Sequence, residues 1–260
     1  MYGKQMRALK RDQALVVIKP LQQSCLNLMG EGKNEDPTLM QGWALPEADI
    51  ESFQDHAAFH HHSLGNRGFL FTLFGRHVEC AEFFLREGVD SWEKTNVAMF
   101  AHMWCTFLKG VSFYAAAQQT RKRKYIKVAR RFKQRLVDWE KQGNPNLFYY
   151  ITCLQGEEMW FRGKHPEAIE LLERSIINAV RTGHLHDAAL ASERLSQLHR
   201  ETNRFSEEAG YRLKQAVKFY RDWGAMAKVD QLEKLLREDD GQLPMPTELA
   251  LPSRLSTSAN

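Results

Sequence analysis

The chain is poor in cysteine and has no long apolar segment, and each shortage argues against a class of protein. Its four cysteines are widely spaced and form no Cys-x-x-Cys pair, which argues against a disulfide framework or a zinc site. We expect them to be reduced, buried thiols. The apolar run Ala14 to Ile18 near the N-terminus is too short for a signal-peptide core or a membrane span. The expected location is therefore the cytoplasm.

A strong charge of one sign is also lacking. The formal net charge of +4 over 260 residues is too small to imply a polyanionic partner by itself. Hydrophobic residues make up 43% of the chain and charged residues 26%, which is typical of a soluble, folded protein. The length allows one large domain or two modest ones with an ample core.

Strand patterns are scarce. The best candidate is FLFTLF, residues 69–74, which periodicity alone cannot distinguish from a buried helix. Elsewhere apolar residues recur with the helical period of 3.6. Pro166 suits a first helical turn, Gly183 a helix end and Ser206 an N-cap. These signals predict helices over about 124–141, 166–182, 187–201, 206–223 and 225–236.

The pair Trp223-Gly224 separates two of these predicted helices. Glycine weakens a helix interior but adopts the left-handed conformation that ends a helix and turns the chain. We therefore predict a corner at Gly224 between two antiparallel helices, with the Trp223 side chain filling it.

Small residues recur where paired helices would cross. Gly156 and Ala168 have the spacing of the small residues in a tetratricopeptide hairpin, and Ala209 and Ala216 repeat the second-helix pattern. Ala209 follows Ala168 by 41 residues, so the unit is about 40 residues long. The predicted fold is an all-α, tetratricopeptide-like solenoid of antiparallel helix pairs.

Composition divides the chain into four segments. We expect an N-terminal helix over residues 1–29 and an acidic, Gly- and Pro-containing loop over 30–49. The helical-repeat domain follows over 50–238. Residues 239–260 hold three prolines and many small polar residues, which predicts a disordered tail or a linker.

The second half of the chain resembles a known family. The ordered ending A…Y…WGA.AKV..LE, carried here by residues 216–233, and NPNLFYY at 144–150 are similar to the helical region of very large signalling proteins. In those proteins a kinase-like domain and a STAND-class AAA ATPase precede the helices, and GAF sensors with a histidine kinase or cyclase follow. The resemblance covers about residues 65–238. It implies a helical relay segment.

None of that family's catalytic motifs is in this sequence. There is no GxxxxGK[ST], HRD or DFG, so no catalytic residue, cofactor or metal is predicted. We expect a non-catalytic protein-interaction or signal-relay scaffold, either a fragment or a free-standing relative of a larger signalling protein. A groove between helices would bind a protein or peptide. The candidate binding residues are exposed arginines on the helix ridges: Arg130, Arg131, Arg194, Arg200 and Arg212.

A basic segment supports an alternative function. Residues 121–135 contain nine basic residues and no acidic one, which suits RNA or another polyanion. The simpler interpretation is a solvated helix face whose aromatic residues are buried in the core. The patch could also receive the acidic residues 31–55, which hold seven acids and one lysine.

A histidine cluster supports a second alternative, a metal-dependent enzyme. His56 and His60 would share a helix face at the i, i+4 spacing found in zinc sites, with His61 and His62 beside them. HExxH is missing, and a polar helix surface explains the cluster equally well.

Overall fold

The computed structural model describes residues 12–90, 101–203 and 206–240. Within these ranges the regular structure is entirely helical, which confirms the all-α prediction. FLFTLF forms the end of helix α4 (Ala57–Leu73) and its C-cap residue Phe74 rather than a strand. Phe69 to Phe74 are all buried. Because every side of this part of the helix is buried, its sequence is apolar throughout and lacks the alternation of apolar and polar residues that identifies a surface helix.

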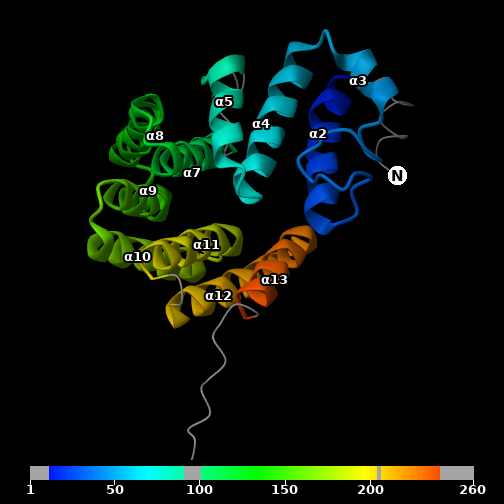
Figure 1. The fold of residues 1–260 in the computed structure, drawn as a ribbon. Coiled ribbons are helices and arrows are strands. Elements are labelled where there is room, and N and C mark those ends of the chain that lie inside the picture. The colour runs from blue at the N-terminus through cyan, green and yellow to red at the C-terminus, as the bar shows by residue number, and fades with distance from the viewer. Residues whose placement is uncertain (1–11, 91–100, 204–205, 241–260) are drawn as a thin grey trace, which may run out of the picture.

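From α4 onward, successive helices of the described residues pack against one another along the chain (Figure 1). The first part comprises α2 (Asp12–Met29), α3 (Glu47–Phe53), α4 and α5 (His77–Glu87). The second part comprises α7 (Ala101–Thr120), α8 (Arg123–Lys141), a 3-10 turn (Pro145–Leu147), α9 (Phe148–Phe161), α10 (His165–Arg181), α11 (Leu185–Thr202), α12 (Glu207–Trp223) and α13 (Met226–Asp240).

Two helices overlap the boundaries predicted for the loop and for the tail. The loop predicted over 30–49 ends at Pro46, because Glu47 begins α3. Glu47 and Asp49 lie in the first turn of α3, where acidic side chains are favourable to the helix dipole. At the other end, α13 continues to Asp240. Residues 1–11 and 241–260 lie outside the described part of the chain.

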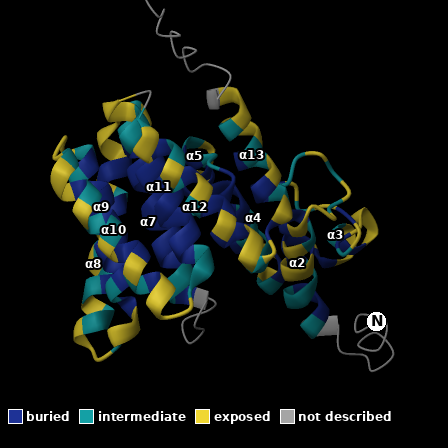
Figure 2. Ribbon diagram, turned by 90° about the horizontal axis from the view of Figure 1, so that it is seen from below, coloured by how far each residue is buried: buried dark blue, intermediate teal, exposed yellow. Residues whose placement is uncertain are grey.

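The last described helix returns to the first. Helix α13 contacts α2, and Gln231 Nε2 donates a hydrogen bond of 3.3 Å to the carbonyl oxygen of Phe74. The path of helices therefore closes on itself (Figure 1). Buried residues concentrate in and around α7, α11 and α12 (Figure 2). A smaller core of Leu15, Val16, Leu45, Phe53 and Phe59 joins α2, α3 and α4.

Small residues lie where helices α9 and α10 approach. A Cβ atom placed on Gly156 would lie 2.9 Å from Leu172 Cγ and 3.3 Å from the Ala168 carbonyl oxygen. Ala168, Ala209 and Ala216 are buried, each on the second helix of its predicted pair. The absence of larger side chains at these positions lets the helices pack closely.

Glycine ends helix α12 in the left-handed conformation. Gly224 has φ 92° and ψ 12°, and Ala225 N donates a 2.9 Å hydrogen bond to Tyr220 O across the turn. The same helix begins at Ser206, whose side chain accepts from Ala209 N. Trp223 lies beside the corner, stacked on His186 with ring centroids 5.1 Å apart.

We expect Gly224→Val to lower the free energy of unfolding by about 1 to 3 kcal/mol, because a β-branched residue is strained at positive φ. Apart from Gly224 and its chain neighbours, no atom lies within 4 Å of the added Cβ. The loss of stability therefore measures the strain of the backbone conformation and not a steric clash with another residue. Gly210 provides a matched control within α12, where Gly210→Ala should raise stability by about 0.5 to 1 kcal/mol. Urea denaturation of both variants measures the difference. A Gly224→Val protein as stable as the wild type contradicts the strain argument.

Candidate interaction surfaces

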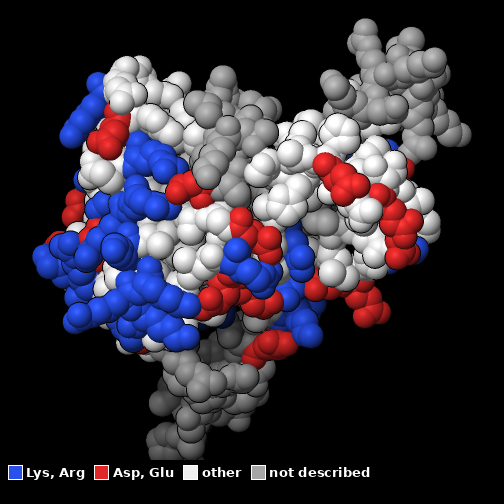
Figure 3. Space-filling view, turned by 90° about the horizontal axis from the view of Figure 1, so that it is seen from above, with Lys and Arg blue, Asp and Glu red and all other residues white. Residues whose placement is uncertain are grey.

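Helix α8 buries its apolar face and exposes its basic one. Tyr125, Ile126, Ala129, Phe132 and Leu136 are buried in the main core. The helix packs against α7 and α9, so these residues cannot reach a ligand. Lys and Arg side chains gather on the side of the molecule where α8 lies (Figure 3).

Several basic side chains of α8 are already neutralised by acids of neighbouring segments. Arg130 Nε lies 3.0 Å from Glu158 Oε1, and Lys133 binds the other oxygen of the same carboxylate. Burial opposes ionisation of Glu158, but the hydrogen bond from Lys133 and the nearby guanidinium groups outweigh it and lower its pKa. Arg131 and Arg135 both pair with Asp90, at 3.0 and 3.1 Å.

Three exposed cations at the start of α8 make no ion pair with any described residue: Lys122, Arg123 and Lys127. We call these three residues the α8 basic row. Arg121 precedes them with φ 57° and donates a 3.3 Å hydrogen bond to Phe161 O. The α8 basic row is therefore available to an anionic partner.

The acidic residues 31–55 lie away from α8. Asp36 pairs with Arg76 at 2.8 Å, and Asp49 pairs with Lys19. The ion pairs that the structure describes for α8 are instead with Glu82 of α5, Glu158 of α9 and Asp90. The hypothesis that the basic patch receives the acidic loop of the same chain is therefore wrong.

The five candidate arginines do not form one ridge. Arg194 is only 2% exposed, which corrects its expected position on a binding surface. Arg200 is partly buried near the end of α11, and Arg212 pairs with Glu173. The structure brings only Arg130 and Arg131 together, as exposed neighbours of the α8 basic row.

Arg194 instead forms a buried, two-point ion pair. Its Nε and Nη2 atoms donate to the two carboxylate oxygens of Glu157 at 2.7 and 2.8 Å. Gln118 of α7 accepts a further hydrogen bond, and the guanidinium lies 4.5 Å from the centroid of the Trp160 ring. The pair thus ties α7, α9 and α11 together.

A second buried pair lies between α11 and α13. Lys228 Nζ donates to Glu193 Oε1 at 2.8 Å, and Tyr220 Oη donates to the other oxygen at 3.2 Å. The positive charges of Arg194 and Lys228 both act on buried His77: burial first, then these charges, hold its pKa well below the ordinary value. Sequence reasoning missed these groups. The available signal was the charged pair Glu193-Arg194 inside a run of small apolar residues.

We expect Arg194→Ala to lower the free energy of unfolding by about 3 to 5 kcal/mol, because it leaves the Glu157 carboxylate buried without its partner. Arg131→Ala is the control, since that exposed pair should contribute at most about 1 kcal/mol. Thermal and urea unfolding of the two variants test this. Equal, small losses would show that Arg194 is not a structural cation.

A buried carboxylate lies among aromatic side chains at the start of α11. Trp104 Nε1 donates to Asp187 Oδ1 at 3.2 Å. Burial raises the pKa of Asp187 to about 7, and the hydrogen bond from Trp104 opposes part of this rise. Burial, together with the charge of His184, lowers the pKa of neighbouring His186 to about 4. His186 is therefore neutral at pH 7, whereas Asp187 is neutral only below about pH 7.

Replacement of Asp187 by asparagine should change how stability depends on pH. An unfolded aspartate loses its proton near pH 4 and folded Asp187 near pH 7, so wild-type stability falls as pH rises between these values. Asp187→Asn removes this loss and keeps an oxygen to accept from Trp104. We expect similar stability near pH 4 and a gain of about 2 to 4 kcal/mol above about pH 7.

Urea denaturation of the wild type and Asp187→Asn at several pH values measures this difference. His186 Nε2 lies 3.5 Å from Asp187 Oδ2, so the measured difference includes any change that the substitution causes in the titration of His186. A difference that stays constant from about pH 4 to pH 8 would contradict the raised pKa.

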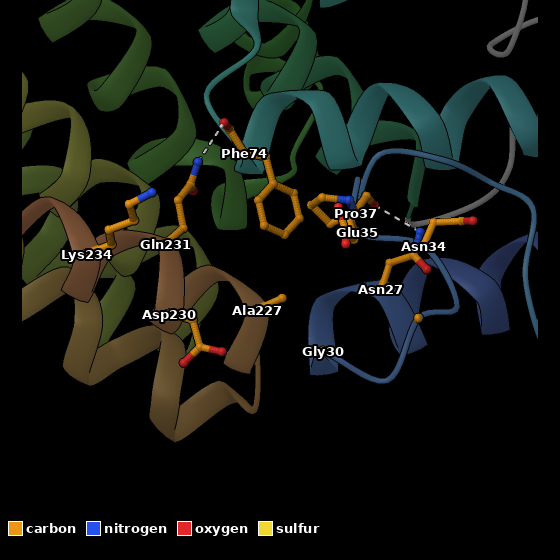
Figure 4. A pocket seen from close by; sticks show the side chains of 11 residues that line it. Asn27, Gly30, Asn34, Glu35, Pro37, Phe74, Ala227, Asp230, Gln231 and Lys234 are labelled. Atoms are coloured by element: carbon orange, nitrogen blue, oxygen red, sulfur yellow. Dashed lines mark hydrogen bonds between the residues drawn. The ribbon is translucent and has the colours of Figure 1, made fainter.

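An open pocket of about 500 Å³ lies where α13 meets the end of α2 (Figure 4). The Phe74 ring points into it between Glu35 and Pro37 on one side and Gln231 on the other. Its charged residues, Glu35, Asp230 and Lys234, are all exposed. The pocket is therefore an open surface depression at the contact between the last described helix, α13, and the first, α2.

The histidine cluster does not form a metal site of the expected kind. His56 precedes α4, and His60, His61 and His62 lie on it. Across the described residues, no three His, Cys, Asp or Glu side chains come together as metal ligands. His60 and His61 contact each other edge to edge, with ring centroids 5.7 Å apart.

The cysteines are buried with one exception. Cys80, Cys105 and Cys153 lie in the core, whereas Cys25 is exposed on α2, contrary to expectation. Burial raises the pKa of Cys80 to about 11 and that of Cys153 well above its ordinary value. These two thiols are therefore poor nucleophiles at neutral pH.

Comparisons with known proteins place the chain in no family. No family model matches it, and no curated protein or solved structure is significantly similar to it. The helices in the described ranges are all too short or too polar to cross a membrane.

Proposed function

We propose that this protein is a non-catalytic interaction scaffold in the cytoplasm, and that its α8 basic row binds an acidic segment of a partner protein. The observation that carries the proposal is the set of three exposed cations on α8 without ion-pair partners among the described residues. Arg130 and Arg131 extend this surface, since each remains about half exposed beside its acid.

The proposed architecture is a tetratricopeptide-like solenoid of antiparallel helix pairs. The close approach of Gly156 to Leu172 and the packing of consecutive helices support it. The WGA.AKV..LE ending has a structural explanation in the same terms. Gly224 turns the chain, and Lys228 pairs with Glu193. The apolar residues Ala225, Val229 and Leu232 are buried. This agrees with a relay segment like those of large ATPase and kinase signalling proteins.

The inner charged residues are poor candidates for partner binding. Glu157, Arg194, Glu193 and Lys228 are buried and satisfy one another. Separating them to admit a peptide would leave buried charges unpaired, at a cost of several kcal/mol. An outer surface such as α8 requires no such rearrangement.

RNA binding through the same row is the competing function. Single-stranded RNA is held by exposed aromatic side chains as well as by cations. The α8 aromatics Tyr125 and Phe132 have no exposed surface, so α8 could offer only phosphate contacts. An acidic peptide needs no stacking, which favours a protein partner.

We expect Lys122→Glu/Arg123→Glu/Lys127→Glu to weaken binding of a fluorescent Asp- and Glu-rich peptide by about 10-fold or more, because three attractions become repulsions. The matched control is Arg174→Glu/Arg181→Glu/Lys214→Glu, which makes the same change in net charge at exposed positions on α10 and α12. Fluorescence anisotropy measures both.

A mixed-sequence RNA of about 20 nucleotides is titrated in parallel at several salt concentrations. Tighter binding of the RNA than of the peptide, with a steep salt dependence, would replace the proposal by the polyanion function. Equal loss of peptide binding in the control would show that net charge alone acts.

A further inference from the structure

We propose that the acidic partner of the α8 basic row is the N-terminal acidic surface of a second copy of this chain. This inference rests on the proposed function of α8 and names its partner. It joins two surfaces that have opposite charge, lie on different parts of one molecule and do not meet within it.

Five carboxylates of residues 31–55 are exposed, and we call them the N-terminal acidic surface: Glu31, Glu35, Glu47, Glu51 and Asp55. None of them makes an ion pair with a described residue, whereas the other two acids of residues 31–55 are used internally by Arg76 and Lys19. Lys33 is the single basic residue in that stretch. This surface therefore has an unbalanced negative charge that a cationic partner would neutralise.

An exposed tryptophan lies on the same part of the molecule. Trp43 is 70% exposed, and Lys33 Nζ makes a cation–π contact with its ring at 5.7 Å from the ring centroid. The adjacent Ala44 lines an open apolar groove of about 430 Å³ with Leu21, Cys25 and Leu26. Exposed aromatic surface beside charges is typical of protein interfaces, and the Trp43 ring offers a second contact for a guanidinium group.

The charges of α8 and of the N-terminal segment match in sign but cannot meet within one chain. Helices α3 and α8 lie on opposite sides of the molecule (Figure 1), and Figure 3 shows basic side chains concentrated at one end of a face whose other end carries mainly acidic ones among its charged side chains. The described ion pairs of α8 are with Glu82, Asp90 and Glu158. Only another molecule can bring the two free surfaces together.

Because the two surfaces differ, the contact joins unlike patches. Two copies can satisfy both contacts in a closed pair, or copies can add one after another in an open chain. The contact uses exposed charges, so it should be weak at physiological ionic strength and strengthen when salt is lowered.

Sedimentation velocity of the purified chain at several concentrations tests the proposal, at about 50 mM and about 500 mM salt. We expect a mass that rises with concentration at low salt and is that of the monomer at high salt. Lys122→Glu/Arg123→Glu/Lys127→Glu and Glu47→Lys/Glu51→Lys/Asp55→Lys should each raise the concentration needed for association about 10-fold or more. The Arg174→Glu/Arg181→Glu/Lys214→Glu protein should associate like the wild type.

Mixing the two charge-reversed proteins supplies the decisive comparison. The α8-reversed protein has two acidic surfaces, and the protein reversed at Glu47, Glu51 and Asp55 has two basic ones. Neither should associate with itself, but the two proteins attract each other, so the mixture should associate in a one-to-one ratio. A wild-type chain that stays monomeric at low salt overturns the inference, and so does association that neither reversal weakens. If the chain is monomeric yet α8 still binds the acidic peptide, only the inference fails. If α8 reversal changes neither measurement, the proposed function fails as well.

Discussion

The structure depends on the burial of four charges at the place where its helices meet. Glu157 and Arg194 form a two-point pair, and Glu193 and Lys228 form another one residue away along α11. A charge left alone in such a position costs several kcal/mol, so α9, α11 and α13 must hold the register that keeps both pairs intact. The requirement that α11 satisfy partners on both sides fixes α13, and the position of α13 lets it reach α2 and close the helical path.

This internal use of charge restricts where a partner can bind. In an open helical repeat the inner helices would present polar side chains to a ligand. Here Arg194 and Lys228 are buried and paired, so the inner polar residues serve stability. The surface charges that remain available lie outside, and those on α8 and on the N-terminal segment are the ones that both proposals use.

Local features of the fold could be predicted from sequence, and contacts between distant residues could not. The helix ends at Gly224 and Ser206 depend on conformations that single residue types favour, so the sequence alone predicts their positions. Arg194 was placed on a surface because periodicity shows that a residue leaves the apolar stripe but does not show what faces it. Its partner Glu157 lies 37 residues earlier, on another helix, and no spacing rule connects them. The same limit applies to α8. The sequence shows its run of basic residues, but it does not show which acidic residues of other helices pair with them.

Net charge conceals the separation of charge that the fold creates. A value of +4 suggests no strong attraction to any partner, yet it is the difference between 36 basic and 32 acidic residues. Folding pairs many of these charges, and among those it leaves unpaired are cations on α8 and carboxylates on the N-terminal segment. A molecule with two such poles is attracted to other molecules in particular orientations, and this attraction acts mainly on orientation and encounter rate. Binding strength must then come from the groups the poles bring together, among which Trp43 has the largest unburied aromatic surface that the structure describes.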